Sequence, residues 1–266
     1  MVAKVVVFVL SAAIVVSSGV AQDVVPLVLW HGIGGSCCDP HHLGQLIALI
    51  EKEVPGIYIH SISFGKNPTE DVFFSFYGLL SDQVSQVCDA LANDTRLANG
   101  FNAMGFGQGG LFLRALVQRC GKVRVRNLIS VGGPQQGSYG LPYCPGNNAS
   151  LCRVVHHTVM KHGVYTPGVQ KLITVAQYWQ DPKYEEKYEK DCIFLPDLNQ
   201  MNVTNPVYKE RIVTLTNFVL VKLELDRVVN PTESEVYIEK EGEQKRAKSV
   251  ESSLTSFSPI IHPHFS

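Results

Sequence analysis

The chain has 266 residues, 45% of them hydrophobic, and a formal net charge of −1 at pH 7. This length suits one α/β domain, or a domain with a small cap, and the apolar content is sufficient for a core. The near-neutral charge gives no support for nucleic-acid binding, and no nucleic-acid partner is expected.

The N-terminus predicts a secretory signal peptide over residues 1–21. Lys4 precedes an apolar run from Val5 to Val16, and the small residues Gly19–Ala21 stand at the expected cleavage site. The run is too short for a membrane-spanning helix, and no later segment is apolar enough to span a membrane. The mature protein is therefore expected in the secretory pathway, without a transmembrane anchor.

Strand and helix patterns then alternate along the chain. Val24–Trp30 is an apolar run that predicts a central strand of a parallel sheet, buried on both faces. The elements expected after it are a helix over Leu43–Glu53, a strand over Ile57–Ile62, a long helix over Val72–Leu97, strands over Phe101–Met104 and Leu128–Val131 with a helix over Leu111–Arg119 between them, and a late strand over Phe218–Leu223. This order predicts the α/β class, with a doubly wound and mostly parallel sheet.

The glycine-rich stretch Asn102–Gly110 is the most informative part of the chain. A strand, a glycine-rich turn and a helix are the context of the nucleophile elbow, G-x-S-x-G. The serine of that motif would fall at position 107, between Gly105 and Gly109, and this sequence has Gly107 there. The sequence therefore predicts an elbow without its nucleophile.

The same glycines allow two other interpretations. Gly105, Gly107 and Gly110 also spell G-x-G-x-x-G, which indicates dinucleotide binding when an acidic residue follows about 20 residues later. No carboxylate occurs between Gly107 and Asp181, which argues against a dinucleotide. A plain glycine-rich turn stays open as an alternative.

Two further segments fit a hydrolase site. The His31-Gly32 turn follows an early strand, where α/β-hydrolases place a second backbone donor for the oxyanion, although a tight connecting loop is an equal alternative. Asp226 follows the late strand, where a hydrolase triad keeps its acid. The alternative is an exposed loop aspartate.

The segment from residue 140 to 196 changes character. It contains helical patterns over Leu151–Lys161 and Val169–Trp179 and the charged run Lys183–Lys190, without a strand pattern between them. A helical cap over residues 140–196 is expected, inserted between core segments 22–139 and 197–250, with a divergent tail over 251–266. The apolar faces of its helices either cover a ligand groove or only seal the core.

Sequons and cysteines support an oxidising compartment. Three sequons predict glycosylation at Asn93, Asn148 and Asn202. Of the seven cysteines, Cys88 is predicted to pair with Cys120 and Cys144 with Cys152; Cys192 is predicted to be free, and Cys37 and Cys38 are the two that remain. No C-x-x-C or His/Cys cluster has metal-ligand spacing, so no metal and no cofactor are expected.

Together these residues resemble the palmitoyl-protein thioesterase family, over about residues 24–250. The matching segments are His31–Cys38, Met104–Gly110, Leu128–Gly133, Gly140–Pro142, Cys144–Gly146, Tyr178–Trp179, Asp181–Pro182 and Val221–Lys222 with Asp226. The resemblance implies an α/β-hydrolase that removes long-chain fatty-acyl groups from protein cysteine thioesters in the lysosome lumen, with a monomeric state expected and secretion as an alternative.

The resemblance also implies roles for single residues. Position 107 would hold the nucleophilic serine, Asp226 would be the triad acid, and the amides of Gln108 and Ile33 would bind the oxyanion. It implies a disulfide between the adjacent Cys37 and Cys38, although their Cα separation of about 3.8 Å lies under the usual disulfide range.

Two departures from the family pattern are severe. Gly107 replaces the serine, and no Asp-His sequence follows Asp226, where only His262 and His264 occur. No last strand and last helix are predicted over 251–266, so the final elements of the hydrolase fold are expected to be missing. Three interpretations follow: a thioesterase by descent with impaired catalysis, a non-catalytic lumenal protein that binds acyl chains or acylated proteins, and a product without a stable fold.

Overall fold

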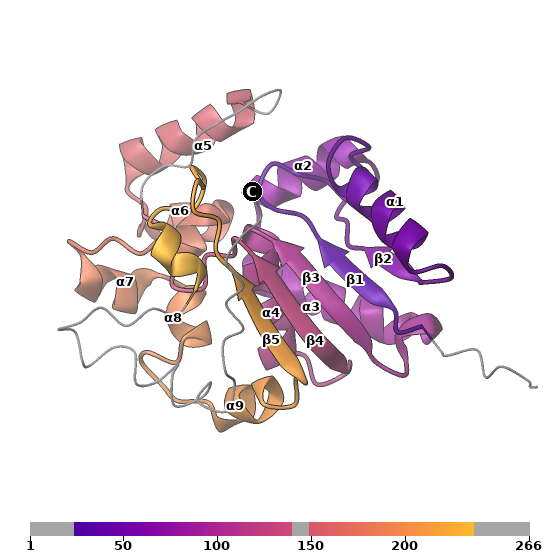
Figure 1. The fold of residues 1–266 in the computed structure, drawn as a ribbon. Helices are drawn as coiled ribbons and strands as arrows, with labels where there is room; N and C mark the ends of the chain where they lie inside the picture. Colours follow the sequence, from indigo (N-terminus) through magenta and orange to yellow (C-terminus); the bar gives the residue numbers. More distant parts are fainter. Residues whose placement is uncertain (1–23, 140–148, 237–266) are drawn as a thin grey trace, which may run out of the picture.

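The computed structural model describes residues 24–139 and 149–236, and in that part five strands form a parallel sheet (Figure 1). The strands are β1 (Leu27–Trp30), β2 (Ile59–Ser61), β3 (Phe101–Phe106), β4 (Val125–Val131) and β5 (Asn217–Val221). They lie in the order β2-β1-β3-β4-β5, and each neighbouring pair is parallel. The predicted parallel sheet is thereby confirmed.

Helices connect the strands. They are α1 (Leu43–Glu53), α2 (Pro68–Phe76), α3 (Leu80–Asn93), α4 (Gln108–Arg119), α5 (Ala149–His162), α6 (Pro167–Leu172), α7 (Glu185–Asp191), α8 (Leu195–Leu198) and α9 (Pro206–Ile212), with 3-10 turns η1 (Thr95–Leu97), η3 (Val175–Tyr178) and η4 (Thr232–Glu235). In Figure 1, α5 to α8 lie on the left, on the side of β5 and away from α1, while α5 also contacts α2. These helices come from the chain between β4 and β5, where the sequence predicts helices and no strands.

The two faces of the sheet are covered by different helices. Along β1, Leu27 and Leu29 share an apolar cluster with residues of α1, while Val28 and Trp30 pack in a larger cluster with α3 and α4. Side chains of a strand alternate between its faces, so this division is what a doubly wound sheet requires. Burial of each such side chain stabilises the fold by about 1.5–3 kcal/mol.

The single long helix expected over Val72–Leu97 is wrong. The chain breaks at Gly78, whose φ of 121° lies in a region that glycine adopts readily. The Gly78 amide donates to the Leu172 carbonyl, and Tyr77 forms an antiparallel bridge with Ile173. The helix expected over Val169–Trp179 is interrupted at this same contact. Its Leu172 carbonyl and Thr174 amide form hydrogen bonds with the backbone of residues 76–78 and not within a helix.

Predicted boundaries otherwise differ by a few residues. α1 begins and ends as predicted, whereas β1 begins at Leu27 and α4 already at Gln108, directly after Gly107. Within the described residues, no helix is long and apolar enough to cross a membrane. The predicted signal peptide, Cys144, Asn148, His262 and His264 lie outside the described residues.

Both described disulfide predictions are confirmed. Cys88 and Cys120 are bonded, joining the end of α3 to the end of α4, and the adjacent Cys37 and Cys38 are bonded as the family resemblance implies. Cys192 is free and buried, also as predicted.

Candidate active site

Gly107 has the backbone of a nucleophile elbow. It lies between β3 and α4 with φ 50° and ψ −123°, a combination that non-glycine residues rarely adopt outside functional sites. Its amide donates to the Val131 carbonyl at the end of β4, and its carbonyl accepts from the Gly110 amide. The turn is therefore tied to the neighbouring strand and to its own helix.

Neighbouring glycines make this turn possible. A methyl group on Gly105 would lie 2.5 Å from the Gly110 nitrogen, and one on Gly109 would lie 2.5 Å from the His31 carbonyl oxygen. A methyl group on Gly107 would meet only the Gly32 Cα, at 3.8 Å, which is ordinary contact. The elbow requires glycine at 105 and 109 for packing, while position 107 has room for a side chain.

The two expected oxyanion donors come from adjoining loops. Gln108 is the first residue of α4, where a backbone N–H has no partner inside the helix and the helix dipole favours negative charge. Ile33 belongs to the His31–Gly34 turn after β1, which touches the elbow through Gly32 and Gly107. Both residues line the same cavity as Gly107.

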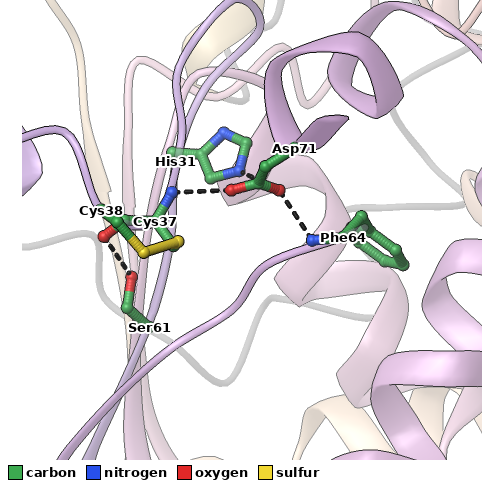
Figure 2. Close-up of a disulfide and its surroundings, with 6 residues drawn as sticks. All are labelled: His31, Cys37, Cys38, Ser61, Phe64 and Asp71. Atoms are coloured by element: carbon green, nitrogen blue, oxygen red, sulfur yellow. Dashed lines mark hydrogen bonds and ion pairs between the residues drawn. A yellow bond between two sulfur atoms is a disulfide. The ribbon is translucent and has the colours of Figure 1, made fainter. Parts of the chain in front are cut away.

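A buried aspartate holds the loop that carries Ile33. Asp71 of α2 is 1% exposed, and it accepts the Cys37 amide at 2.8 Å and the Phe64 amide at 2.7 Å. His31 Nε2 lies 3.2 Å from Asp71 Oδ1. Figure 2 shows the carboxylate between these groups, beside the Cys37–Cys38 disulfide. One side chain thus contacts His31 and Cys37, which stand before and after Ile33 in this loop.

Ser75 and Gln108 connect the same loop to α4 and to η3. The Ser75 hydroxyl accepts the Gly34 amide at 2.8 Å, and its carbonyl accepts the Gln108 side-chain amide at 2.9 Å. The Tyr178 hydroxyl donates to the Gln108 side-chain carbonyl at 2.9 Å. Burial raises the pKa of Tyr178, so its hydroxyl stays a donor.

A cavity of about 280 Å³ opens in front of the elbow. Its walls are mostly apolar and come from the carboxyl ends of β3 and β4, from η3 and from the segment after β5; they include Phe106, Val131, Val175, Leu223, Val228 and Val229. Asp226 is the one charged residue among its described lining residues, and none of those residues is a histidine. Such a space suits an apolar ligand with one polar end.

Asp226 is held by its own backbone. Its Oδ1 accepts the Val228 amide at 2.6 Å and the Val229 amide at 3.3 Å. The buried Glu235 lies beside it, and burial together with the charge of Asp226 raises the pKa of Glu235 to about 7.

The structure brings four residues singled out from the sequence to one cavity: Gly107, Gln108, Ile33 and Asp226. Sequence reasoning missed Asp71, Ser75, Tyr178 and Glu235. Two of these, Ser75 and Tyr178, lie within stretches expected to be helical, and both contact Gln108, which is far from them along the chain, so no local pattern marks them. Asn93 and Asn202, two of the predicted glycosylation sites, are exposed.

Comparisons with known proteins agree on one family. A family model described as palmitoyl protein thioesterase matches residues 26–257. Palmitoyl-protein thioesterase 1 of Caenorhabditis elegans is 44% identical over 214 residues, covering 80% of this chain and 71% of that protein. Palmitoyl-protein thioesterase 3 of Dictyostelium discoideum is 35% identical, covering 79% and 68%. A Bacillus licheniformis lipase structure aligns with TM-score 0.42 at 11% identity, over 76% of this chain and 67% of that one.

Proposed function

Because this chain belongs to the palmitoyl protein thioesterase family and has its α/β-hydrolase fold, we propose that it binds fatty-acyl thioesters of proteins without hydrolysing them at a useful rate. The acyl chain occupies the apolar cavity, and the thioester carbonyl lies at the elbow. The observation that carries this proposal is Gly107, which has the elbow backbone and no side chain.

Each part of the cavity has a role in binding. The amides of Ile33 and Gln108 donate to the carbonyl oxygen of the thioester, and such a donor contributes about 3 kcal/mol to an oxyanion during catalysis. The apolar walls near Val175 and Val229 contact the acyl chain. The carbonyl carbon then lies over Gly107.

The missing step is covalent. In the serine mechanism a hydroxyl attacks the carbonyl carbon and a histidine takes its proton. The tetrahedral adduct then expels the thiol, which receives that proton, and leaves an acyl-enzyme that water hydrolyses. Gly107 has no oxygen with which to form that ester. Ser138 also lines the cavity, but its hydroxyl donates to the Asn230 carbonyl at 3.3 Å and it lies outside the elbow. Water attack assisted only by the oxyanion donors is slow.

The compartment and the domain division belong to the same proposal. The N-terminal signal pattern, the sequons and the disulfides support a lumenal protein, and a related Drosophila melanogaster protein is named a lysosomal thioesterase homologue. We place this chain in the lysosome lumen. The expected cap belongs to this proposal in its described part, residues 149–196, and it is supported by η3, which lines the cavity beside the elbow.

A binding experiment with a matched pair of variants tests the proposal. A fluorescent palmitoyl-thioester peptide is titrated with the protein, and the free thiol is measured in the same samples. Val228→Trp fills the cavity wall and should weaken binding at least tenfold, whereas Val207→Trp on α9 lies outside the described lining and should not. Equal affinity of both variants would contradict the cavity as the binding site.

A further inference from the structure

Glu235 has no place in the proposed binding function, yet it is a fully buried carboxyl beside the site. It lies in η4 with 0% of its surface exposed. Its Oε2 accepts the Leu223 amide at 2.6 Å. Leu223 begins the turn that ends at Asp226, and the Asp226 amide donates to the Leu223 carbonyl at 3.1 Å. Glu235 therefore holds the start of the acid turn.

The second oxygen of Glu235 needs a proton. Oε1 is buried and meets no N–H or O–H donor among the described residues. The Asp226 carboxyl lies beside the Glu235 carboxyl, within reach of a hydrogen bond between the two side chains. Two ionised carboxylates are acceptors only, so this contact becomes a hydrogen bond only when one of them carries a proton.

The surroundings favour placing that proton on Glu235. Burial is the largest cause that raises the pKa of Glu235, and the negative charge of Asp226 adds to it. Lys222, at the end of β5, acts in the opposite direction, but its ammonium group lies 3.1 Å from Glu233 Oε1. The Asp226 Oδ1 instead accepts two backbone amides.

We propose that Glu235 is a positioning residue for Asp226. The protonated carboxyl of Glu235 donates to the Asp226 carboxylate and holds the Leu223–Asp226 turn against the cavity. In an acidic lumen the pair shares one proton and the turn is closed. Above neutral pH the two charges repel each other and the turn loosens. The significance of this pair for the site rests on the proposed function, but the pairing does not.

The sign of the pH dependence follows from the raised pKa of Glu235, about 7 in the folded chain. The folded state binds this proton more tightly than the unfolded chain, where a glutamate titrates near pH 4.3. The stabilisation is therefore complete below that ordinary value and is lost as the pH rises through about 7.

The test is a carboxyl titration by NMR, together with thermal melting from pH 5 to 8, and it uses no acyl ligand. In the native chain, the Glu235 signal should titrate near pH 7 and the Asp226 signal should shift with the same midpoint. The melting temperature should fall across this range. Glu235→Gln keeps the size of the side chain and donates an N–H at any pH. The fall of the melting temperature between pH 5 and 8 should therefore be smaller in this variant.

Matched variants make the outcome decisive. Glu210→Gln removes an exposed carboxylate on α9, away from the Leu223–Asp226 turn, and it should leave the Glu235 midpoint within a few tenths of a unit. Asp226→Asn should lower the Glu235 midpoint, because the repelling charge is gone. A Glu235 midpoint in the ordinary range of glutamate, or an Asp226 signal that does not follow it, would overturn the inference. Loss of acyl binding with the titration intact would contradict only the proposed function.

Discussion

The elbow and the acid turn line one cavity, but they are held in different ways. The elbow around Gly107 is shaped by backbone packing, with Gly105 and Gly109 pressed against neighbouring chain segments. The turn at Asp226 is shaped by side chains, since carboxyl oxygens of Asp226 and Glu235 accept its backbone amides. No atom of a side chain at position 107 is needed to form the elbow.

This difference explains how the site can keep its shape without its nucleophile. Removal of a side chain from the elbow leaves every backbone contact there in place, so the folded structure does not depend on that side chain. Removal of a carboxyl from the acid turn leaves a half-buried amide unpaired, which costs about 1 kcal/mol. Catalysis and folding are therefore separable at position 107 and coupled at positions 226 and 235.

The largest expected effect comes from adding a methyl group to the elbow. Gly109→Ala places carbon 2.5 Å from the His31 carbonyl oxygen, so β1 and α4 must move apart. We expect a loss of about 4 kcal/mol or more in unfolding free energy, measured by urea denaturation. Gly168→Ala is the control, since a methyl group there meets nothing within 4 Å. A mild effect at Gly109 would contradict packing as the basis of the elbow.

The disulfide that clamps α4 should have the next largest effect. Cys88 and Cys120 are 32 residues apart, and the chain-entropy relation gives about 3–4 kcal/mol for a loop of that size. The paired Cys88→Ala and Cys120→Ala substitutions should lower the unfolding free energy by about this amount. Cys192→Ala, which changes a free buried thiol, serves as the comparison. If the double variant were no less stable than the Cys192 variant, the clamp would have no role.

Asp71 offers a test of the loop that carries Ile33. Asp71→Asn keeps the shape but removes the charge that two amides and His31 face, and we expect a loss of about 2 kcal/mol. Asp89→Asn breaks an exposed ion pair with Lys122 and should cost less than about 1 kcal/mol. Hydrogen exchange at Cys37 and Phe64 should speed up in the Asp71 variant alone. Unchanged exchange there would refute the anchoring role of Asp71.

The smallest structural effect is expected at the elbow's centre. Gly107→Ser fits the available space but must adopt the strained φ of 50°, so a cost of about 1–3 kcal/mol is expected. Gly107→Ala controls for that strain. Serine alone should restore no more than a trace of hydrolysis, because none of the described cavity residues is a histidine that could take its proton. Recovery well above a trace would show that a base reaches the site.

Local patterns predicted the elbow but not its supports. Glycines at fixed spacing between a strand and a helix are visible in the sequence, and so is an acid after a late strand. The pairing of Asp71 with His31 and of Glu235 with Asp226 arises only when separate turns and helices meet in the folded chain. The break at Gly78 was missed for the same reason, since the partner of its amide is Leu172.

The most direct test of the account is a single-turnover measurement. A palmitoyl-thioester peptide is mixed with a small excess of the native protein, and the bound peptide, the free thiol and any acyl-protein are measured over time. We predict bound peptide, thiol release at the rate of buffer alone, and no mass shift of the protein by an acyl group. Thiol release above that of buffer, suppressed by the cavity-filling Val228→Trp substitution and not by Val207→Trp, would contradict the claim that this site binds without hydrolysing.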